Sequence, residues 1–189
     1  VVVGAGIEHG NLHLLRRAQE WQGLLHCTRR FTACIPCHEH ALPYRDSAGL
    51  LSLGVGHLLT KSELASGKIL LPTFGRCRYG DHPWPDMWID ALLRQDLRRV
   101  EEALARNVTV PLSQGQYDVL CSWIFNVGVE AFRTSTLRKR LNASLYAEVP
   151  AQLRRWVYAG GHVVAGLRTR REREAAAWEG EGIAMDRVQ

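Results

Sequence analysis

The stretch YRDSAGLLSLGVGH, residues 44–57, carries the clearest structural pattern in the chain. A polar half that ends at Gly49 is followed by an apolar half that ends at His57, as in two short strands joined by a turn. Gly54 and Gly56 would let the second strand approach a neighbouring element closely. The stretch therefore predicts a small β-hairpin.

The rest of the chain is mainly helical in pattern. Residues 88–104 repeat apolar side chains along one face of a long amphipathic helix. Ser113 and Gln116 form a capping box ahead of a buried helix that should end at Gly128. Shorter helices are expected over 12–26, from about Ser135, over 150–156 and over 167–178. The Gly, Pro and aromatic residues of 67–86 predict a loop insertion.

Length and charge limit the class of protein. A chain of 189 residues, 46% of them hydrophobic, is long enough for one sizeable core. Its 24 Lys and Arg exceed its 19 Asp and Glu, and the net charge of +5 favours an acidic partner such as nucleic acid, an anionic membrane or an anionic wall polymer. No run approaches the roughly 20 apolar residues of an integral membrane segment. Five irregularly spaced cysteines favour a reducing compartment.

A second motif, Cys34-Ile-Pro-Cys37-His38, allows three interpretations. It has the spacing of a c-type haem attachment site, it could bind zinc, or it could simply precede a catalytic carboxylate at Glu39. Nothing else in the chain supplies the pocket and distal ligand that haem needs, and zinc sites usually require a second ligand pair. The sequence therefore predicts no cofactor and no metal, with zinc at this cluster as the alternative.

Several ordered motifs resemble the phage-type lysozymes, or endolysins. They follow that family in order along the chain: YRDSAG and GVGH within 44–57, VPLSQGQYD at 110–118, FNVG at 125–128, WVYAGG at 156–161 and GLRTRRERE at 166–174. The resemblance implies an α+β, predominantly helical, two-lobed fold with a small β-hairpin lobe and a helical lobe around a substrate cleft. It also implies a lysozyme-like catalytic domain over 37–178, after an N-terminal extension of 1–36 and before a tail of 179–189.

The resemblance implies that the protein hydrolyses the β-1,4 bond between N-acetylmuramic acid and N-acetylglucosamine in peptidoglycan. This reaction needs a carboxylic acid that protonates the glycosidic oxygen and a carboxylate that activates water or stabilises the transition state. Asp46 in the hairpin turn suits the second role. Ser52, where the family has Thr, keeps the hydroxyl that can hold the attacking water.

The position of the acid departs from the family pattern. The family places its Glu nine residues before the Asp, and in this chain that position is Cys37. Glu39 is the nearest carboxyl group, and a connection two residues shorter through His40–Pro43 would bring it into place. The sequence therefore predicts Glu39 as the acid, with a non-hydrolysing peptidoglycan-binding protein that has lost its acid as the alternative.

The expected partner is the anionic bacterial wall, and neither nucleic acid nor a second copy of the chain is expected. No signal peptide is visible, so the sequence predicts a protein held in the host cytoplasm until release to the periplasm and cell wall. By resemblance, His57 should pair with Asp96 on the long helix, and this carboxylate should raise the pKa of His57.

Overall fold

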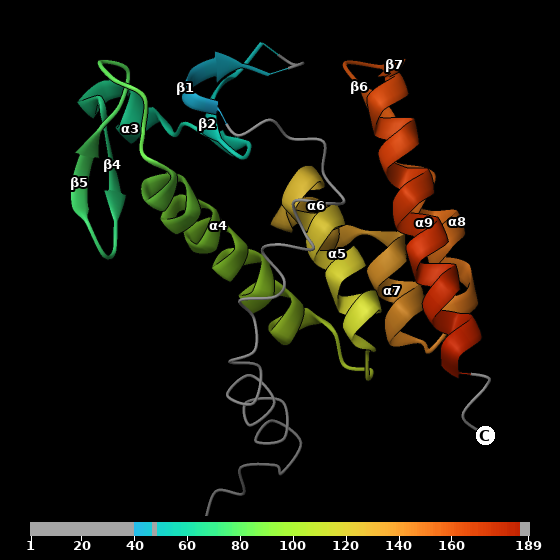
Figure 1. Ribbon diagram of the computed structural model, residues 1–189. Helices are drawn as coiled ribbons and strands as arrows, with labels where there is room; N and C mark the ends of the chain where they lie inside the picture. The colour runs from blue at the N-terminus through green and yellow to red at the C-terminus, as the bar shows by residue number, and fades with distance from the viewer. Residues whose placement is uncertain (1–39, 47–48, 186–189) are drawn as a thin grey trace, which may run out of the picture.

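The computed structural model describes residues 40–46 and 49–185, which form two lobes joined by one long helix, α4 (Asp86–Asn107) (Figure 1). Short strands and a short helix make up one lobe, and helices with one small hairpin make up the other (Figure 1). The helix predicted over 12–26, the Cys34–His38 motif and Glu39 all lie outside the described residues.

The predicted hairpin is present in the small lobe, but a turn at Val55 and Gly56 divides its second strand, which was expected to run to His57. Strands β1 (His40–Arg45), β2 (Leu51–Gly54) and β3 (His57–Leu58) form an antiparallel sheet in that order. Strand β1 begins at His40, so residues 40–43 belong to a strand and not to the connection that we expected. Pro43 is tolerated there because β1 is an edge strand with an irregular register between His40 and Tyr44.

The prediction of a loop over 67–86 was wrong. Strands β4 (Lys68–Leu71) and β5 (Gly75–Arg78) form a second antiparallel hairpin, preceded by helix α3 (Lys61–Ser66). One face of this hairpin buries Ile69, Leu71 and Cys77 in the core, and this burial accounts for the strands. Helix α3, which was not predicted, begins with a capping box between Thr60 and Glu63.

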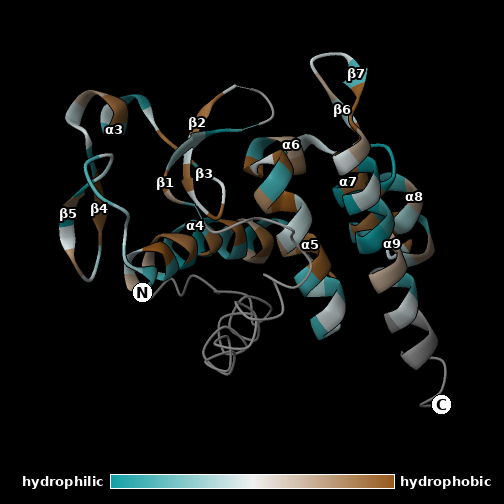
Figure 2. Cartoon of the chain, turned by 45° about the horizontal axis from the view of Figure 1, so that its top comes forward, coloured by the Kyte–Doolittle hydropathy of each residue, from teal (hydrophilic) through white to brown (hydrophobic). Residues whose placement is uncertain are grey.

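Helix α4 buries the face that its sequence pattern predicted, including Ile89, Leu93, Leu97 and Val100. It passes beneath strands β1 to β3 with hydrophobic residues along its length (Figure 2). A Cβ atom on Gly54 would approach Ile89 Cγ2 to 3.3 Å, so this glycine permits the close contact between β2 and α4.

The helical lobe surrounds α5 (Gln114–Val127), whose capping box and end at Gly128 are as predicted. Two further helices also follow the prediction, with differences at their ends: α7 (Thr136–Asn142) and α9 (Ala165–Met185). Helix α8 (Val149–Leu153) ends before Trp156 because the chain turns there, with Trp156 N–H donating to the Leu153 carbonyl. Three elements were not predicted: α6 (Val129–Thr134), the 3₁₀ helix η2 (Tyr146–Glu148) and the hairpin of β6 (Tyr158–Ala159) and β7 (His162–Val163).

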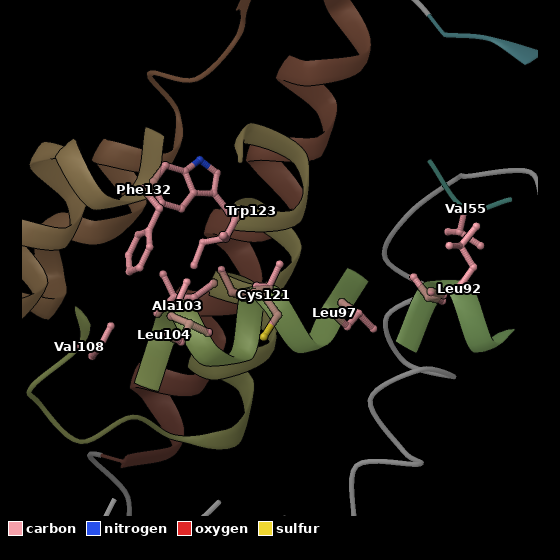
Figure 3. Close-up of a cluster of buried hydrophobic side chains, with 14 of the residues drawn as sticks. Val55, Leu92, Leu97, Ala103, Leu104, Val108, Cys121, Trp123 and Phe132 are labelled. Atoms are coloured by element: carbon pink, nitrogen blue, oxygen red, sulfur yellow. The ribbon is translucent and has the colours of Figure 1, made fainter. Parts of the chain in front are cut away.

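Aromatic rings fill the centre of the helical lobe. Trp123 of α5 meets Phe132 edge-on at 6.1 Å and Trp156 at 5.3 Å between ring centroids. Figure 3 shows Trp123 beside Phe132 in the helical lobe, and Val55 beside Leu92 toward the small lobe. The buried core is therefore continuous from one lobe to the other along α4.

A hydrogen bond from Ser122 to the buried, ion-paired Glu174 connects α5 to α9. Glu174 accepts a hydrogen bond from Ser122 Oγ at 2.7 Å and lies 2.7 Å from Arg171 Nε. Burial lowers the pKa of the Arg171 guanidinium to about 10, although the charge of Glu174 opposes that effect. Removing Glu174 would leave the Arg171 guanidinium buried without its counter-charge, which is among the most destabilising changes a core can undergo, whereas removing Arg171 would leave Glu174 paired with Arg170 at 3.2 Å.

Candidate active site

A tight turn positions Asp46 at the end of β1. The backbone N–H of Leu50 donates to Asp46 Oδ1 at 2.9 Å, and Asp46 N–H donates to the Leu50 carbonyl at 2.9 Å. Gly49 adopts a left-handed φ of 78°, and its carbonyl accepts a hydrogen bond from Arg45 Nη1 at 2.8 Å. These bonds orient the carboxylate at a partly buried position.

The sheet register brings Ser52 to the same face as Asp46. Tyr44 lies opposite Ser52, and Arg45 lies opposite Leu51. Since side chains alternate along a strand and opposite residues share a face, Tyr44, Ser52 and Asp46 point to one side of the sheet. Ser52 is buried, with 2% of its surface exposed, so its hydroxyl is held in a fixed environment.

The irregularity in β1 shortens the distance along the sheet between His40 and Asp46. His40 lies opposite Gly54 and Tyr44 opposite Ser52, so four steps along β1 match only two along β2. The rings of His40 and Tyr44 lie 4.0 Å apart, as this compression requires. Measured along the partner strand β2, the separation of His40 and Asp46 is therefore about four residues instead of six, or roughly 13 Å along the sheet.

His57 lies between two carboxylates at the junction of the lobes. Its Nδ1 is 2.8 Å from Asp96 Oδ2 on α4, so the predicted pair is confirmed. Its Nε2 is 3.3 Å from Glu63 Oε2 on α3, a partner that was not predicted. Ionised carboxylates only accept hydrogen bonds, so the protonated form of the ring, with an N–H on each nitrogen, can donate to both partners.

The contacts within this triad of His57, Asp96 and Glu63 shift the pKa values of His57 and Glu63. Burial by itself lowers the pKa of His57, but the hydrogen bonds and charges of Asp96 and Glu63 outweigh it and raise that pKa. Burial likewise raises the pKa of Glu63, but two hydrogen bonds from Thr60 and the charge of His57 outweigh it and lower that pKa. The triad therefore ties the β2–β3 turn to both α3 and α4.

Asp96→Asn should lower the pKa of His57 and reduce the free energy of unfolding by about 2 kcal/mol at about pH 5.5. The stabilisation that comes from the raised pKa of His57 is complete at pH values below the pKa of His57 in the unfolded chain. It disappears as the pH rises through the pKa of His57 in the folded protein. The stabilisation that comes from the lowered pKa of Glu63 is present at pH values above the pKa of Glu63 in the unfolded chain. It disappears as the pH falls through the pKa of Glu63 in the folded protein. NMR titration and urea unfolding over the pH range measure both effects.

Asp90→Asn is the matched control, because Asp90 is an exposed carboxylate on the same helix. It should leave the pKa of His57 and its pH profile unchanged. An identical His57 titration in the wild type and in Asp96→Asn would show that the pair does not stabilise the fold.

Within residues 40–46 and 49–185, no group of three or more His, Cys, Asp or Glu side chains is arranged to hold a metal ion. Cys77 and Cys121 are buried free thiols in that part of the chain. The helices described there are all too short or too polar to cross a membrane. Zinc binding by Cys27, Cys34, Cys37 and either His38 or His40 stays an untested alternative, since all of these residues except His40 lie outside the described ranges.

Comparison with known proteins covers most of the chain. The sequence pattern described as phage lysozyme matches residues 39–174, which include the hairpin, the triad and α5. The chain belongs to the phage lysozyme family. The SAR-endolysin of Escherichia phage Mu is 42% identical to this lysozyme over 141 residues, or 75% of this chain and 72% of that protein. The endolysin of Salmonella phage P22 is 36% identical over 124 residues, or 65% and 75% of the two chains.

Solved structures agree with this assignment. The crystal structure of a P22 lysozyme mutant matches with a TM-score of 0.62 at 32% identity, covering 82% of this lysozyme and 95% of that chain. The active form of P1 phage endolysin matches with a TM-score of 0.61 at 16% identity over 92% and 85%, and shows the likeness of fold alone. The predicted α+β lysozyme fold is therefore confirmed. As a phage lysozyme, the protein is a glycoside hydrolase, a muramidase that lyses bacterial peptidoglycan.

Proposed function

We propose that this lysozyme hydrolyses the β-1,4 bond between N-acetylmuramic acid and N-acetylglucosamine with Glu39 as the general acid and Asp46 as the second carboxylate. The observation that carries the proposal is the turn that fixes Asp46, on the sheet face that also presents Ser52. In this scheme Glu39 protonates the leaving oxygen, and Asp46 with the Ser52 hydroxyl holds the attacking water. A single chain supplies all three groups, so we propose a monomeric enzyme that needs no cofactor.

The register of β1 supports the assignment of Glu39. Glu39 directly precedes β1, and the irregular register between His40 and Tyr44 draws that end of the strand toward Asp46. The two catalytic carboxyl groups lie about 6.5–9.5 Å apart in inverting glycosidases and about 5 Å apart in retaining glycosidases. The register places His40, the first described residue of β1, roughly 13 Å along the sheet from Asp46.

The release of reducing ends from purified peptidoglycan tests the proposed bond. Sacculi are incubated with the enzyme, reduced with borohydride and hydrolysed to their constituent amino sugars. Cleavage of the proposed bond converts muramic acid to its reduced alcohol, whereas cleavage of the other glycosidic bond reduces glucosamine. Binding to sacculi with neither product would favour the non-hydrolysing wall-binding alternative, which no observation on this chain favours now.

We further propose that the enzyme stays in the host cytoplasm until it is released to the wall.

Ser52→Ala should lower the rate of peptidoglycan hydrolysis about tenfold, because the loss of one hydrogen bond to the attacking water costs about 1.4 kcal/mol. Ser52→Thr should keep the rate within about threefold, since it retains the hydroxyl. The rates are measured on sacculi beside thermal unfolding of each variant. Equal rates for Ala and Ser at position 52 would remove Ser52 from the site.

A further inference from the structure

The β4–β5 hairpin has an outer face that the proposed hydrolysis does not use. Lys68 lies opposite Arg78, and Leu70 lies opposite Arg76, in the antiparallel register. Opposite residues and residues two apart share a face, so these four side chains project together. The other face is buried in the core, and Lys68, Leu70, Arg76 and Arg78 therefore form an outward-facing surface that we call the hairpin face.

The hairpin holds this face rigidly. The opposite face packs Ile69, Leu71 and Cys77 into the core with at most 3% of each exposed. The Tyr79 hydroxyl donates to the Glu63 carbonyl of α3 at 2.9 Å, and Trp84 Nε1 donates to the Arg78 carbonyl at 2.9 Å. A fixed backbone keeps the three cations and the leucine on one plane, which a loose surface loop would not do.

Within residues 40–46 and 49–185, the positive charges of the hairpin face are not balanced by carboxylates. Lys68 and Arg78 are like charges placed directly opposite each other, an arrangement that costs stability in an antiparallel pair. Over the described part of the chain, these three cations form one ion pair, between Arg78 and Asp81 at 3.9 Å with both side chains more than half exposed. A face shaped only for solubility would mix the two signs of charge, so this face has surplus positive charge for an external anion.

The hairpin face also exposes apolar surface among its charges. Leu70 lies between the cations with 61% of its surface in solvent, and Phe74 at the turn is 40% exposed. A hydrated polymer of sugars and peptides offers carboxylates but no apolar interior for Leu70. A lipid surface offers both, since cationic side chains contact anionic headgroups while apolar side chains enter the acyl boundary.

We propose that the hairpin face docks on an anionic phospholipid bilayer as a peripheral contact. The hairpin lies at the outer end of the small lobe, away from α5 and α9 in both views (Figures 1 and 2). Docking there would leave the β1–β2 sheet and its Asp46 turn uncovered for peptidoglycan. This contact is additional to the proposed hydrolysis and does not depend on it.

Co-sedimentation of the full chain with vesicles tests the proposal. The protein should bind phosphatidylglycerol vesicles and not phosphatidylcholine vesicles at physiological salt. The triple variant Lys68→Gln, Arg76→Gln, Arg78→Gln should bind on the order of a hundredfold more weakly, at about fivefold for each cation near the surface. Its thermal unfolding midpoint should stay equal or rise, because the Lys68–Arg78 repulsion is gone.

A matched triple variant, Arg99→Gln, Arg168→Gln, Arg173→Gln, removes the same charge from exposed positions on α4 and α9. It should bind vesicles within about threefold of the wild type, since it leaves the hairpin face intact. Equal losses in the two triple variants would mean that net charge alone drives binding, and would overturn the proposal.

Leu70→Ser separates a bilayer from the wall polymer. It should weaken vesicle binding about fivefold while leaving binding to purified sacculi unchanged, because only the bilayer buries the leucine. If the hairpin variants lose sacculus binding and keep vesicle binding, the face is a wall contact and the proposal fails. Failure of the wild type to bind phosphatidylglycerol vesicles would also overturn it.

Discussion

Glu39→Gln is expected to reduce peptidoglycan hydrolysis about a thousandfold, because general acid catalysis contributes about 10² to 10⁴ to the rate. The amide of glutamine cannot protonate the glycosidic oxygen, although it has nearly the same size and keeps one acceptor oxygen. The variant should therefore still bind sacculi. Reducing ends released from sacculi measure the rate, and co-sedimentation measures binding.

Cys37→Ser is the decisive control for this prediction, because Cys37 occupies the place where the family spacing puts the acid. It should retain full hydrolysis, since a thiol is too weak an acid for this role. Loss of activity in Cys37→Ser with full activity in Glu39→Gln would show that position 37, and not Glu39, belongs to the site.

Asp46→Asn is expected to lower the rate on the order of a hundredfold or more while the fold stays intact. Asparagine keeps the oxygen that accepts the Leu50 N–H bond, so the turn should survive. What it loses is the negative charge that activates water or stabilises the oxocarbenium-like transition state. Hydrolysis of sacculi and the thermal unfolding midpoint are the two measurements.

Asp81→Asn is the matched control, since Asp81 is an exposed carboxylate of the same lobe that lies outside the sheet with Asp46. Asp81→Asn should change neither the rate of sacculus hydrolysis nor the thermal unfolding midpoint. Full activity in Asp46→Asn would remove Asp46 from the proposed mechanism, whereas loss of both activity and folding would mean that its charge maintains the turn.

The sequence was informative where one pattern dominates a long segment. The apolar repeat of 88–104 predicted α4 and its buried face, and the Ser113–Gln116 box predicted the start of α5. The motif at 44–57 predicted the hairpin and, through resemblance, the contact between His57 and Asp96. In each case the local preference and the tertiary packing favour the same structure.

The second hairpin was missed because its two faces do not alternate clearly in sequence. Strand β4 reads Lys-Ile-Leu-Leu, and the exposed Leu70 hides the alternation that Ile69 and Leu71 would otherwise show. The same exposed leucine is the residue that suggested a lipid contact. Local patterns fail here because an apolar side chain faces solvent.

Glu63 was missed for a different reason. Thr60 and Glu63 have the spacing of a capping box, but no apolar run follows them, so the pattern does not predict a helix. The contact with His57 depends on where α3 packs, which is a tertiary property. Glu39 and its distance from Asp46 are likewise set by three-dimensional packing and stay predictions.

The length of α4 makes the relative position of the two lobes sensitive to bending of this helix. Its 22 residues extend for about 33 Å. Ile89 packs beneath Gly54 toward one end, and Leu104 lies in the buried core toward the other. A bend of about 10° midway along such a rod would swing one lobe by roughly 3 Å relative to the other. The relative position of the lobes therefore depends on the curvature of α4, and a small change in that curvature produces a larger displacement at the far end of the helix.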